Sequence, residues 1–301
     1  MRATILSNRQ FLPSYYLMRL RVPGMTAAFA PGQFVMVRPA AVGDPFLPRA
    51  FSILRGAPAP RGGHVRGEVR GQKDGGRGLG AGTDIEIVYR ALGRGTTLMA
   101  TLGRGNAMEV LGPLGGRGFR PAAGPAIFVA GGVGVPPMVA LAESFANGHR
   151  TASSRKPKTA QRPRPATRDP RPLVLVGGRT KDDVLGVAEF RRAGCRVQVA
   201  TDDGSMGHHG LVTDLLEAAL ADGGDGGRPA IYACGPEGML HAVRRIALAA
   251  EAPCQLCLEA NMACGFGGCM GCAIPVAGEG MGAYKLCCKD GPVFDARDLR
   301  W

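Results

Sequence analysis

The segment Cys264-Gly-Phe-Gly-Gly-Cys269-Met-Gly-Cys272 lies near the carboxyl end of the chain, and a Cys287-Cys288 pair follows it. A Cys-x4-Cys-x2-Cys run with a more distant fourth cysteine is a spacing that holds [2Fe–2S] clusters through four thiolates. The intervening glycines allow a loop to fold around such a cluster with its backbone N–H groups turned toward sulfur. The sequence therefore predicts a [2Fe–2S] site, and spacing alone does not decide between Cys287 and Cys288.

Two other uses of the cysteines are weaker. Zinc prefers paired Cys-x2-Cys knuckles, which Cys254 to Cys257 and Cys269 to Cys272 could supply. Disulfides are disfavoured because the chain is long enough to bury an adequate core and its first residues lack an apolar signal core. We expect a cytoplasmic protein in which Cys195, Cys254 and Cys257 are core thiols.

Composition limits the class of protein. The 301 residues are 45% hydrophobic and include 47 glycines, which indicates a turn-rich globular chain of two or three domains. The apolar stretch 126–145 is interrupted by glycine and proline, so no membrane span is expected. Of the net charge of +13, a large part falls in residues 150–171, and we expect a disordered basic insertion at about 148–172. No groove-reading motif accompanies it, so nucleic acid binding is not expected.

The first hundred residues contain short apolar runs separated by glycine and proline turns, at 33–37, 50–54 and 84–89. This pattern is typical of an antiparallel barrel. Residues 56–82 are rich in glycine and arginine and are expected to form a long surface loop.

From residue 126 the pattern changes to strands alternating with helices. Strands are expected at 126–130, 173–176, 196–200 and 230–233, and helices at 183–193, 211–221 and 237–250. Such alternation predicts a parallel sheet covered by helices.

The first of these strands leads into Gly131-Gly-Val-Gly134-Val-Pro-Pro137. A glycine turn that opens a helix can bring backbone N–H groups up to a phosphate, although tight turns use glycine without any ligand. The segments 201–205 and Cys234-Gly-Pro-Glu-Gly-Met239 follow later strands at the same sheet edge, where open α/β sheets bind ligands. Together the three segments favour a dinucleotide site.

The order barrel, nucleotide domain, cysteine cluster resembles the ferredoxin reductase superfamily, and in particular the electron transfer subunits of class B dihydroorotate dehydrogenase. The resemblance is carried by Arg49-Ala-Phe-Ser52, Val88-Tyr-Arg90 with Gly93-Arg-Gly-Thr96, Gly112-Pro-Leu-Gly115, Gly131 to Pro137, Cys234-Gly-Pro-Glu237, and Met262 through Phe294. It implies a multidomain β plus α/β protein: a flavin-binding antiparallel barrel (1–119), a parallel α/β nucleotide domain (120–250) and a small [2Fe–2S] domain (251–301).

The resemblance also implies roles for individual residues. Arg49 would neutralise the FAD pyrophosphate, Ser52 would hydrogen-bond the isoalloxazine edge, and Cys288 would be the fourth cluster ligand. Cys234 would lie near the nicotinamide and position it. The family usually has proline where this chain has Ala50. The full expected sets are Arg49, Ala50, Phe51, Ser52, Val88, Tyr89, Arg90, Gly95 and Thr96 for FAD; Gly131, Gly132, Gly134, Cys234, Gly235 and Pro236 for NAD(H); and Cys264, Cys269, Cys272 and Cys288 for the metal cluster.

No Ser/His/Asp triad or paired-carboxylate motif stands out, so the cofactors are expected to supply the chemistry. The resemblance implies that NADH reduces FAD, that the cluster takes the electrons singly, and that the FMN of a separate catalytic subunit exchanges them in a heterotetramer. Two alternatives remain: a reductase of the same superfamily that serves a ferredoxin-dependent bifurcating complex or an oxygenase, and a regulatory module without flavin. Arg179 and Lys181 leave a preference for NADPH open.

Overall fold

The computed structural model describes residues 1–26, 28–39, 46–59, 82–122, 124–153, 171–222, 228–278 and 283–301. Side chains are described to residue 146 in the helix that ends at Ser153. Most of the Gly/Arg-rich segment 56–82 and most of the basic segment 148–172 lie outside these residues. The expectation that the insertion begins at about 148 is wrong in its first residues, because helix α2 (Val135–Ser153) continues through them.

The amino-terminal part is an antiparallel sheet of seven strands in the order β4-β3-β7-β1-β2-β6-β5. Buried and partly exposed residues alternate along β6, which is typical of a strand with one face toward a core. The sheet curls into a barrel, and the Leu54 amide closes it by donating to the Glu86 carbonyl at 2.9 Å. The elements are β1 (Arg2–Leu12), β2 (Tyr15–Val22), β3 (Phe34–Arg38), β4 (Arg49–Ser52), β5 (Arg55–Pro58), β6 (Thr83–Arg90), α1 (Arg94–Thr101) and β7 (Ala107–Leu114).

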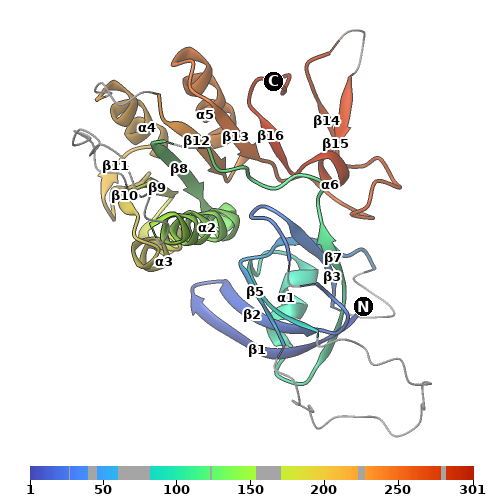
Figure 1. Ribbon diagram of the computed structural model, residues 1–301. Coiled ribbons are helices and arrows are strands. Elements are labelled where there is room, and N and C mark those ends of the chain that lie inside the picture. Colours follow the sequence, from blue (N-terminus) through green and yellow to red (C-terminus); the bar gives the residue numbers. More distant parts are fainter. Residues whose placement is uncertain are drawn as a thin grey trace, which may run out of the picture.

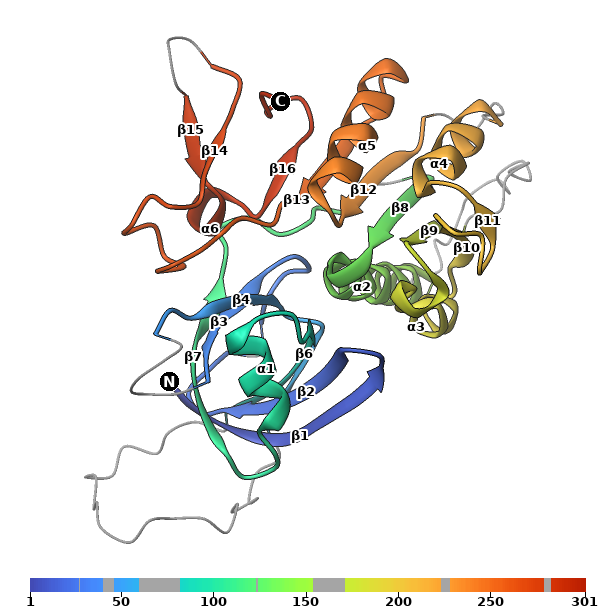
Figure 2. The same cartoon turned by 180° about the vertical axis from the view of Figure 1, so that it is seen from behind.

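The second sheet also has seven strands, in the order β11-β10-β9-β8-β12-β13-β16. Its strands are parallel except for the last pair, β13 with β16. Helices α2 and α3 pack on one face, and α4 and α5 on the other (Figures 1 and 2). The elements are β8 (Ala126–Gly131), η1 (Gly132–Gly134), α2, β9 (Leu173–Gly178), η2 (Lys181–Asp183), α3 (Val187–Arg192), β10 (Arg196–Thr201), β11 (His208–His209), α4 (Val212–Ala221), β12 (Ala230–Cys234), α5 (Glu237–Ala249), β13 (Cys254–Cys257) and β16 (Val293–Asp295).

The barrel and the parallel sheet agree with the predicted fold class. One predicted helix, 183–193, is wrong in its first residues: the chain forms the short turn η2 and then α3, because Gly186 between them adopts the left-handed conformation with φ +75°. The strands β13 and β16 come from the segment expected to form a third domain, and they complete the edge of the second sheet.

The remaining carboxyl-terminal elements are the hairpin β14 (Ala273–Pro275) with β15 (Tyr284–Leu286) and the short helix α6 (Cys287–Asp290). Residues 264–272, named here the cluster loop, lie between β13 and this hairpin. The cluster loop touches the barrel at Gly265, where an added Cβ would lie 2.4 Å from Met36 Cγ. The last residues are tied to α5 by the Arg244 guanidinium, which donates to the carbonyls of Ala296 and Leu299 at 2.8 and 2.7 Å.

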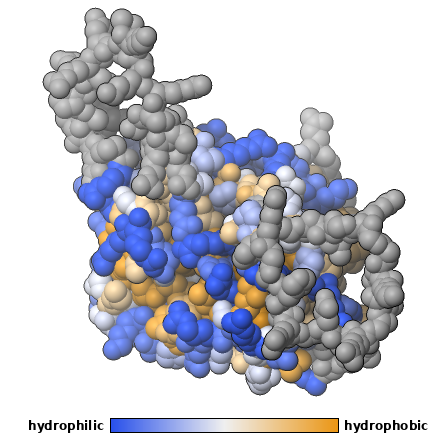
Figure 3. All heavy atoms as spheres, turned by 60° about the horizontal axis from the view of Figure 1, so that its bottom comes forward, coloured by the Kyte–Doolittle hydropathy of each residue, from blue (hydrophilic) through white to orange (hydrophobic). Residues whose placement is uncertain are grey.

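Charged contacts connect the barrel to the parallel sheet. Arg55 donates to Glu143 of α2 from Nε and Nη2, at 2.8 and 2.6 Å. The Tyr15 hydroxyl donates to Asp183 Oδ1 at 3.0 Å, and burial followed by the Asp183 charge raises the pKa of Tyr15 to about 12. Viewed from the barrel end, hydrophilic side chains are interspersed with apolar ones over the described surface (Figure 3).

Candidate functional site

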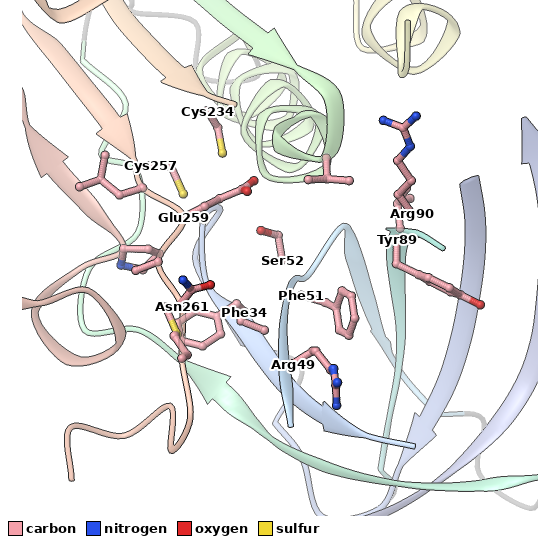
Figure 4. A pocket seen from close by; sticks show the side chains of 18 of the residues that line it. Phe34, Arg49, Phe51, Ser52, Tyr89, Arg90, Cys234, Cys257, Glu259 and Asn261 are labelled. Carbon is pink, nitrogen blue, oxygen red and sulfur yellow. The ribbon is translucent and has the colours of Figure 1, made fainter. Parts of the chain in front are cut away.

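A cavity of about 460 Å³ opens between β4, β6 and the residues that follow β13 (Figure 4). Its walls come from segments far apart in the sequence, because β4 and β6 face the carboxyl edge of the parallel sheet. Seven of the nine predicted flavin residues line this cavity, whereas Gly95 and Thr96 do not. The lining includes Arg49, Ala50, Phe51, Ser52, Val88, Tyr89 and Arg90 from the barrel, and Cys234, Cys257, Glu259 and Asn261 from the other side.

Arg49 lies against the first turn of α1. An added Cβ at Gly95 would lie 2.4 Å from the Arg49 Cζ atom, so only glycine lets the guanidinium approach this closely. The guanidinium donates to the Leu47 carbonyl at 2.6 Å, which leaves most of its N–H groups for a ligand. Arg49 and the start of α1 therefore form the positively charged cradle expected for a pyrophosphate.

Thr96 has a local role in this cradle. Its hydroxyl oxygen accepts from the Leu92 and Gly93 amides at 3.0 and 3.2 Å, so it caps the start of α1. The side chain is therefore placed near the predicted phosphate position, but its hydrogen bonds go to its own turn.

Tyr89 and Arg90 point in opposite directions, as neighbours in a strand do. The Tyr89 ring is buried in the barrel, where its hydroxyl donates to Asn8 Oδ1 at 3.0 Å, and it meets the Phe51 ring edge-on. Arg90 faces the cavity, lies over the Tyr15 ring at 5.1 Å and pairs with Asp183 at 3.3 Å. Its Nε atom is buried and has no hydrogen-bond partner among the described residues, which fits an acceptor supplied by a ligand.

A second cavity of about 420 Å³ adjoins the first and shares Arg90 with it. The predicted nucleotide residues Gly131, Gly132 and Pro236 line it, whereas Cys234 lines the first cavity. Gly134 packs against the Cys234-Gly235 backbone, because an added Cβ would lie 2.4 Å from the Cys234 carbonyl carbon. The glycine turn and the Cys-Gly-Pro turn thus meet, as predicted from their common sheet edge.

The cluster loop directs backbone N–H groups at sulfur. Gly268 donates to Cys264 Sγ at 3.3 Å, and Gly265 and Gly267 adopt φ values of +81° and +92°. Hydrogen bonds from the backbone N–H groups of Phe266, Cys269 and Gly268 and from the Cys269 thiol lower the pKa of Cys264 to about 6. A thiolate stabilised by several N–H donors is the environment that an iron–sulfur ligand needs, so the loop fits the group.

The two adjacent cysteines of α6 point to different places. The Cys288 backbone amide donates to Cys272 Sγ at 3.4 Å, and the Cys272 thiol and the Gly267 amide both influence the Cys288 thiol. Burial, followed by the Cys272 contact, raises the pKa of Cys288 to about 12, and a bound metal would act in the opposite direction. The Cys287 thiol donates instead to the Leu258 carbonyl at 3.5 Å, away from the cluster loop. This geometry favours Cys288 as the fourth ligand.

The structure does not support the first of the two cysteine pairs that could bind zinc. Cys254 and Cys257 are three residues apart in β13, so their side chains lie on opposite faces of the sheet and pack in different core clusters. Within the described ranges, no three histidine, cysteine or carboxylate side chains gather closely enough to hold a single metal ion, and this holds for the four predicted cluster cysteines as well.

Sequence reasoning did not select Glu259, Cys257 or Asp183 as site residues. Glu259 projects into the first cavity, and the surrounding walls raise the pKa of its carboxyl group. In the sequence, Glu259 is a lone carboxylate after the short run 254–258, but only the fold places that run at the ligand-binding edge. Asp183 gave no comparable signal, because its partners Tyr15 and Arg90 are distant in sequence.

Comparisons with known proteins agree with this arrangement. A family described as the iron-sulfur cluster binding domain of dihydroorotate dehydrogenase B matches residues 259–300, and an oxidoreductase NAD-binding domain matches residues 128–245. The dihydroorotate dehydrogenase B (NAD(+)) electron transfer subunit of Bacillus caldolyticus is 34% identical over 99% of this chain and 97% of its own length. The corresponding protein of Caldanaerobacter subterraneus is 32% identical over 99% and 98%.

Solved structures show the fold. The chain of an NADH-dependent reduced ferredoxin-NADP oxidoreductase superposes with a TM-score of 0.73 at 21% identity, covering 99% of this chain and 89% of that one. The ferredoxin reductase of carbazole 1,9a-dioxygenase superposes with a TM-score of 0.58, also at 21% identity, over 84% and 66%. These structural similarities show a shared fold, whereas the full-length sequence relatives show the family. The chain belongs to the family of dihydroorotate dehydrogenase B (NAD(+)) electron transfer subunits.

Proposed function

We propose that this chain is the electron transfer subunit of a dihydroorotate dehydrogenase, carrying electrons between NAD(H), FAD, a [2Fe–2S] cluster and a catalytic partner subunit in pyrimidine biosynthesis. One observation carries the proposal: the three candidate sites are contiguous. The two cavities share Arg90, and residues 257–262 of the first cavity lead directly into the cluster loop. Electrons could therefore pass between the sites without leaving the protein.

The chain's own residues suit the groups they would hold. Arg49 beside Gly95 offers a charged, closely approachable cradle for the FAD pyrophosphate, and the unpartnered Arg90 Nε offers a donor at the junction of both cavities. Ser52 lines the first cavity, where its hydroxyl can bond the ring edge. The glycine turn at 131–134 and the adjoining Cys234-Gly235 backbone would receive NAD(H).

When bound, FAD takes a hydride as an electron pair and the [2Fe–2S] cluster takes electrons singly. The protein's contribution is to place the two sites next to each other and to stabilise the Cys264 thiolate through backbone N–H donors. The assigned ligands are Cys264, Cys269, Cys272 and Cys288. We assign residues 1–119, 120–250 and 251–301 as the corresponding domains, with the edge strands β13 and β16 of the last segment built into the second sheet.

A partner surface lies beside the cluster loop. Large apolar side chains are exposed there, among them Phe46 at 70%, Phe266 at 62% and Met270 at 60%. A hollow of about 830 Å³ includes Phe46, Phe266 and the ligand Cys264. Exposed apolar patches mark protein interfaces, so the FMN-containing catalytic subunit would dock here, with two copies of each subunit in a heterotetramer.

No helix in the described residues is both long and apolar enough to cross a bilayer. We assign the protein to the cytoplasm on the cysteine usage and on the family.

The test is a visible spectrum of the anaerobically purified chain before and after stoichiometric NADH, with flavin and iron quantified. We expect flavin bands and broad cluster absorption, both bleached by NADH, and reduction of an artificial acceptor. A chain that binds no flavin and reduces no acceptor would contradict the proposal. Co-expression with the FMN subunit then tests the partner: copurification and NAD⁺-dependent dihydroorotate oxidation are expected.

A further inference from the structure

Two cysteines end neighbouring strands at the wall of the first cavity. Cys234 is the last residue of β12 and Cys257 the last of β13, and the parallel pairing places them directly opposite each other. Residues paired in this way present their side chains on the same face of the sheet. Both line the cavity, with only 1% and 3% of their surfaces exposed (Figure 4).

The two thiols are close enough to react with each other. Cys234 and Cys257 occupy directly paired positions on neighbouring strands, and both are free thiols in this structure. Adjacent strands lie about 4.7–4.9 Å apart, which falls within the Cα separation of about 4.4–6.8 Å that a disulfide spans. Bond formation therefore requires rotation of side chains at two strand ends and no rearrangement of the sheet.

The neighbouring cysteines are placed differently. Cys254 belongs to the same strand as Cys257 but packs on the opposite face. The Cys287 thiol is engaged with the Leu258 carbonyl. Glu259, two residues beyond Cys257, lines the same cavity and lies close enough to Cys234 to influence its charge. The cavity wall thus holds a paired dithiol with a carboxylate beside it.

We propose that Cys234 and Cys257 form a redox-active dithiol–disulfide couple that exchanges an electron pair with the flavin in this cavity. The inference rests on the proposed function, which supplies the flavin. On oxidation the two S–H bonds break and one S–S bond forms. The oxidised flavin takes both electrons and one proton, and the Glu259 carboxylate takes the other proton. The reverse reaction, fed by NADH through the flavin, restores both thiols.

The position of the Cys234–Cys257 couple favours repeated oxidation and reduction over a permanent structural disulfide. Both thiols line the cavity that would hold the flavin, so the couple lies beside a two-electron carrier. The cluster accepts single electrons, so a nearby two-electron store would let the chain retain a pair until its partner can accept it.

The test uses the full chain with its cofactors. The protein is oxidised with ferricyanide, divided, and one half is reduced anaerobically with excess NADH. Both halves are denatured in acid, alkylated, digested and analysed by mass spectrometry. We expect a Cys234–Cys257 disulfide peptide in the oxidised half and two alkylated thiols in the reduced half. Free thiols at both positions in the oxidised half would overturn the inference.

A second measurement counts electrons. Wild-type protein is expected to consume one more equivalent of NADH during full anaerobic reduction than Cys257→Ser does. Cys254→Ser, the same substitution on the other face of the strand, is the matched control and should titrate like the wild type. Equal consumption by wild type and Cys257→Ser at equal flavin content would contradict the couple alone. Absence of flavin from every variant would contradict the proposed function and this inference with it.

Discussion

The chain contains two groups of cysteines whose surroundings have opposite effects on the thiols. In the cluster loop, hydrogen bonds from backbone N–H groups and the Cys269 thiol lower the pKa of Cys264 to about 6. In the buried thiol group, formed by Cys234, Cys257 and Cys287, the Cys257 thiol followed by burial raises the pKa of Cys234 well above its ordinary value. Burial followed by the neighbouring thiols raises the pKa of Cys287. The loop favours a thiolate at Cys264, whereas the buried group favours neutral thiols at Cys234 and Cys287.

The difference comes from the acceptors that the backbone N–H groups bind in the two regions. Cys234 and Cys257 end strands whose N–H groups are used by the sheet ladder. The cluster loop has no ladder, and its left-handed residues Gly265, Gly267 and Met270 turn successive N–H groups inward. The same amino acid therefore becomes a candidate metal ligand in the loop and a candidate redox pair on the sheet.

The largest expected effect separates the two adjacent cysteines of α6. Cys288→Ser removes the thiol that faces Cys272 and should abolish cluster assembly, because a [2Fe–2S] cluster takes four thiolates. Cys287→Ser changes a thiol that faces the Leu258 carbonyl and should retain the cluster. Iron content and visible absorption of the purified variants measure both. Loss of iron in Cys287→Ser alone would reverse the assignment and place the fourth ligand in the buried thiol group.

A smaller effect is expected from changing the cluster loop without touching a cysteine. In Gly265→Ala, a side chain at φ +81° costs about 1–2 kcal/mol. The new Cβ would also lie 2.4 Å from Met36 Cγ, and such overpacking costs about 1–3 kcal/mol. We expect lower iron occupancy and a lower unfolding temperature, whereas Gly103→Ala, which meets no atom within 4 Å, should leave both unchanged. Full occupancy in Gly265→Ala would show that the loop geometry is not required.

Gly134→Ala is the corresponding glycine substitution beside the buried thiol group. Its Cβ would lie 2.4 Å from the Cys234 carbonyl carbon, so the glycine turn and the Cys-Gly-Pro turn must separate. We expect a loss of about 1–3 kcal/mol in unfolding free energy and weaker NADH binding, with iron content unchanged. Calorimetry and NADH titration measure these. A fall in iron content equal to that of Gly265→Ala would show that the two thiol groups are not independent.

Local sequence patterns predicted most of the helices and strands. The features that they did not predict depend on contacts between residues far apart in the sequence. The Cys-x4-Cys-x2-Cys run and the glycine turn at 131–134 identified their sites because each is contiguous in sequence. Spacing could not separate Cys287 from Cys288, since only the neighbours brought in by folding distinguish their directions. Likewise, nothing local pairs Cys257 with Cys234. Their pairing depends on β13 joining the parallel sheet, and the sequence assigns the segment that forms β13 to a separate domain.

The smallest expected effect tests the carboxylate beside the buried thiol group. Glu259 is exposed to the open cavity, yet desolvation by the cavity walls raises the pKa of its carboxyl group, so the folded chain binds this proton more tightly than the unfolded chain. The free energy of unfolding should therefore decrease as pH rises from the ordinary carboxyl range through the raised pKa. Glu259→Gln should flatten that decrease, and Glu217→Gln, on the exposed side of α4, should not. Unfolding midpoints across the pH range measure this, and a Glu259→Gln profile parallel to the wild type would mean that Glu259 is as well solvated as a surface carboxylate.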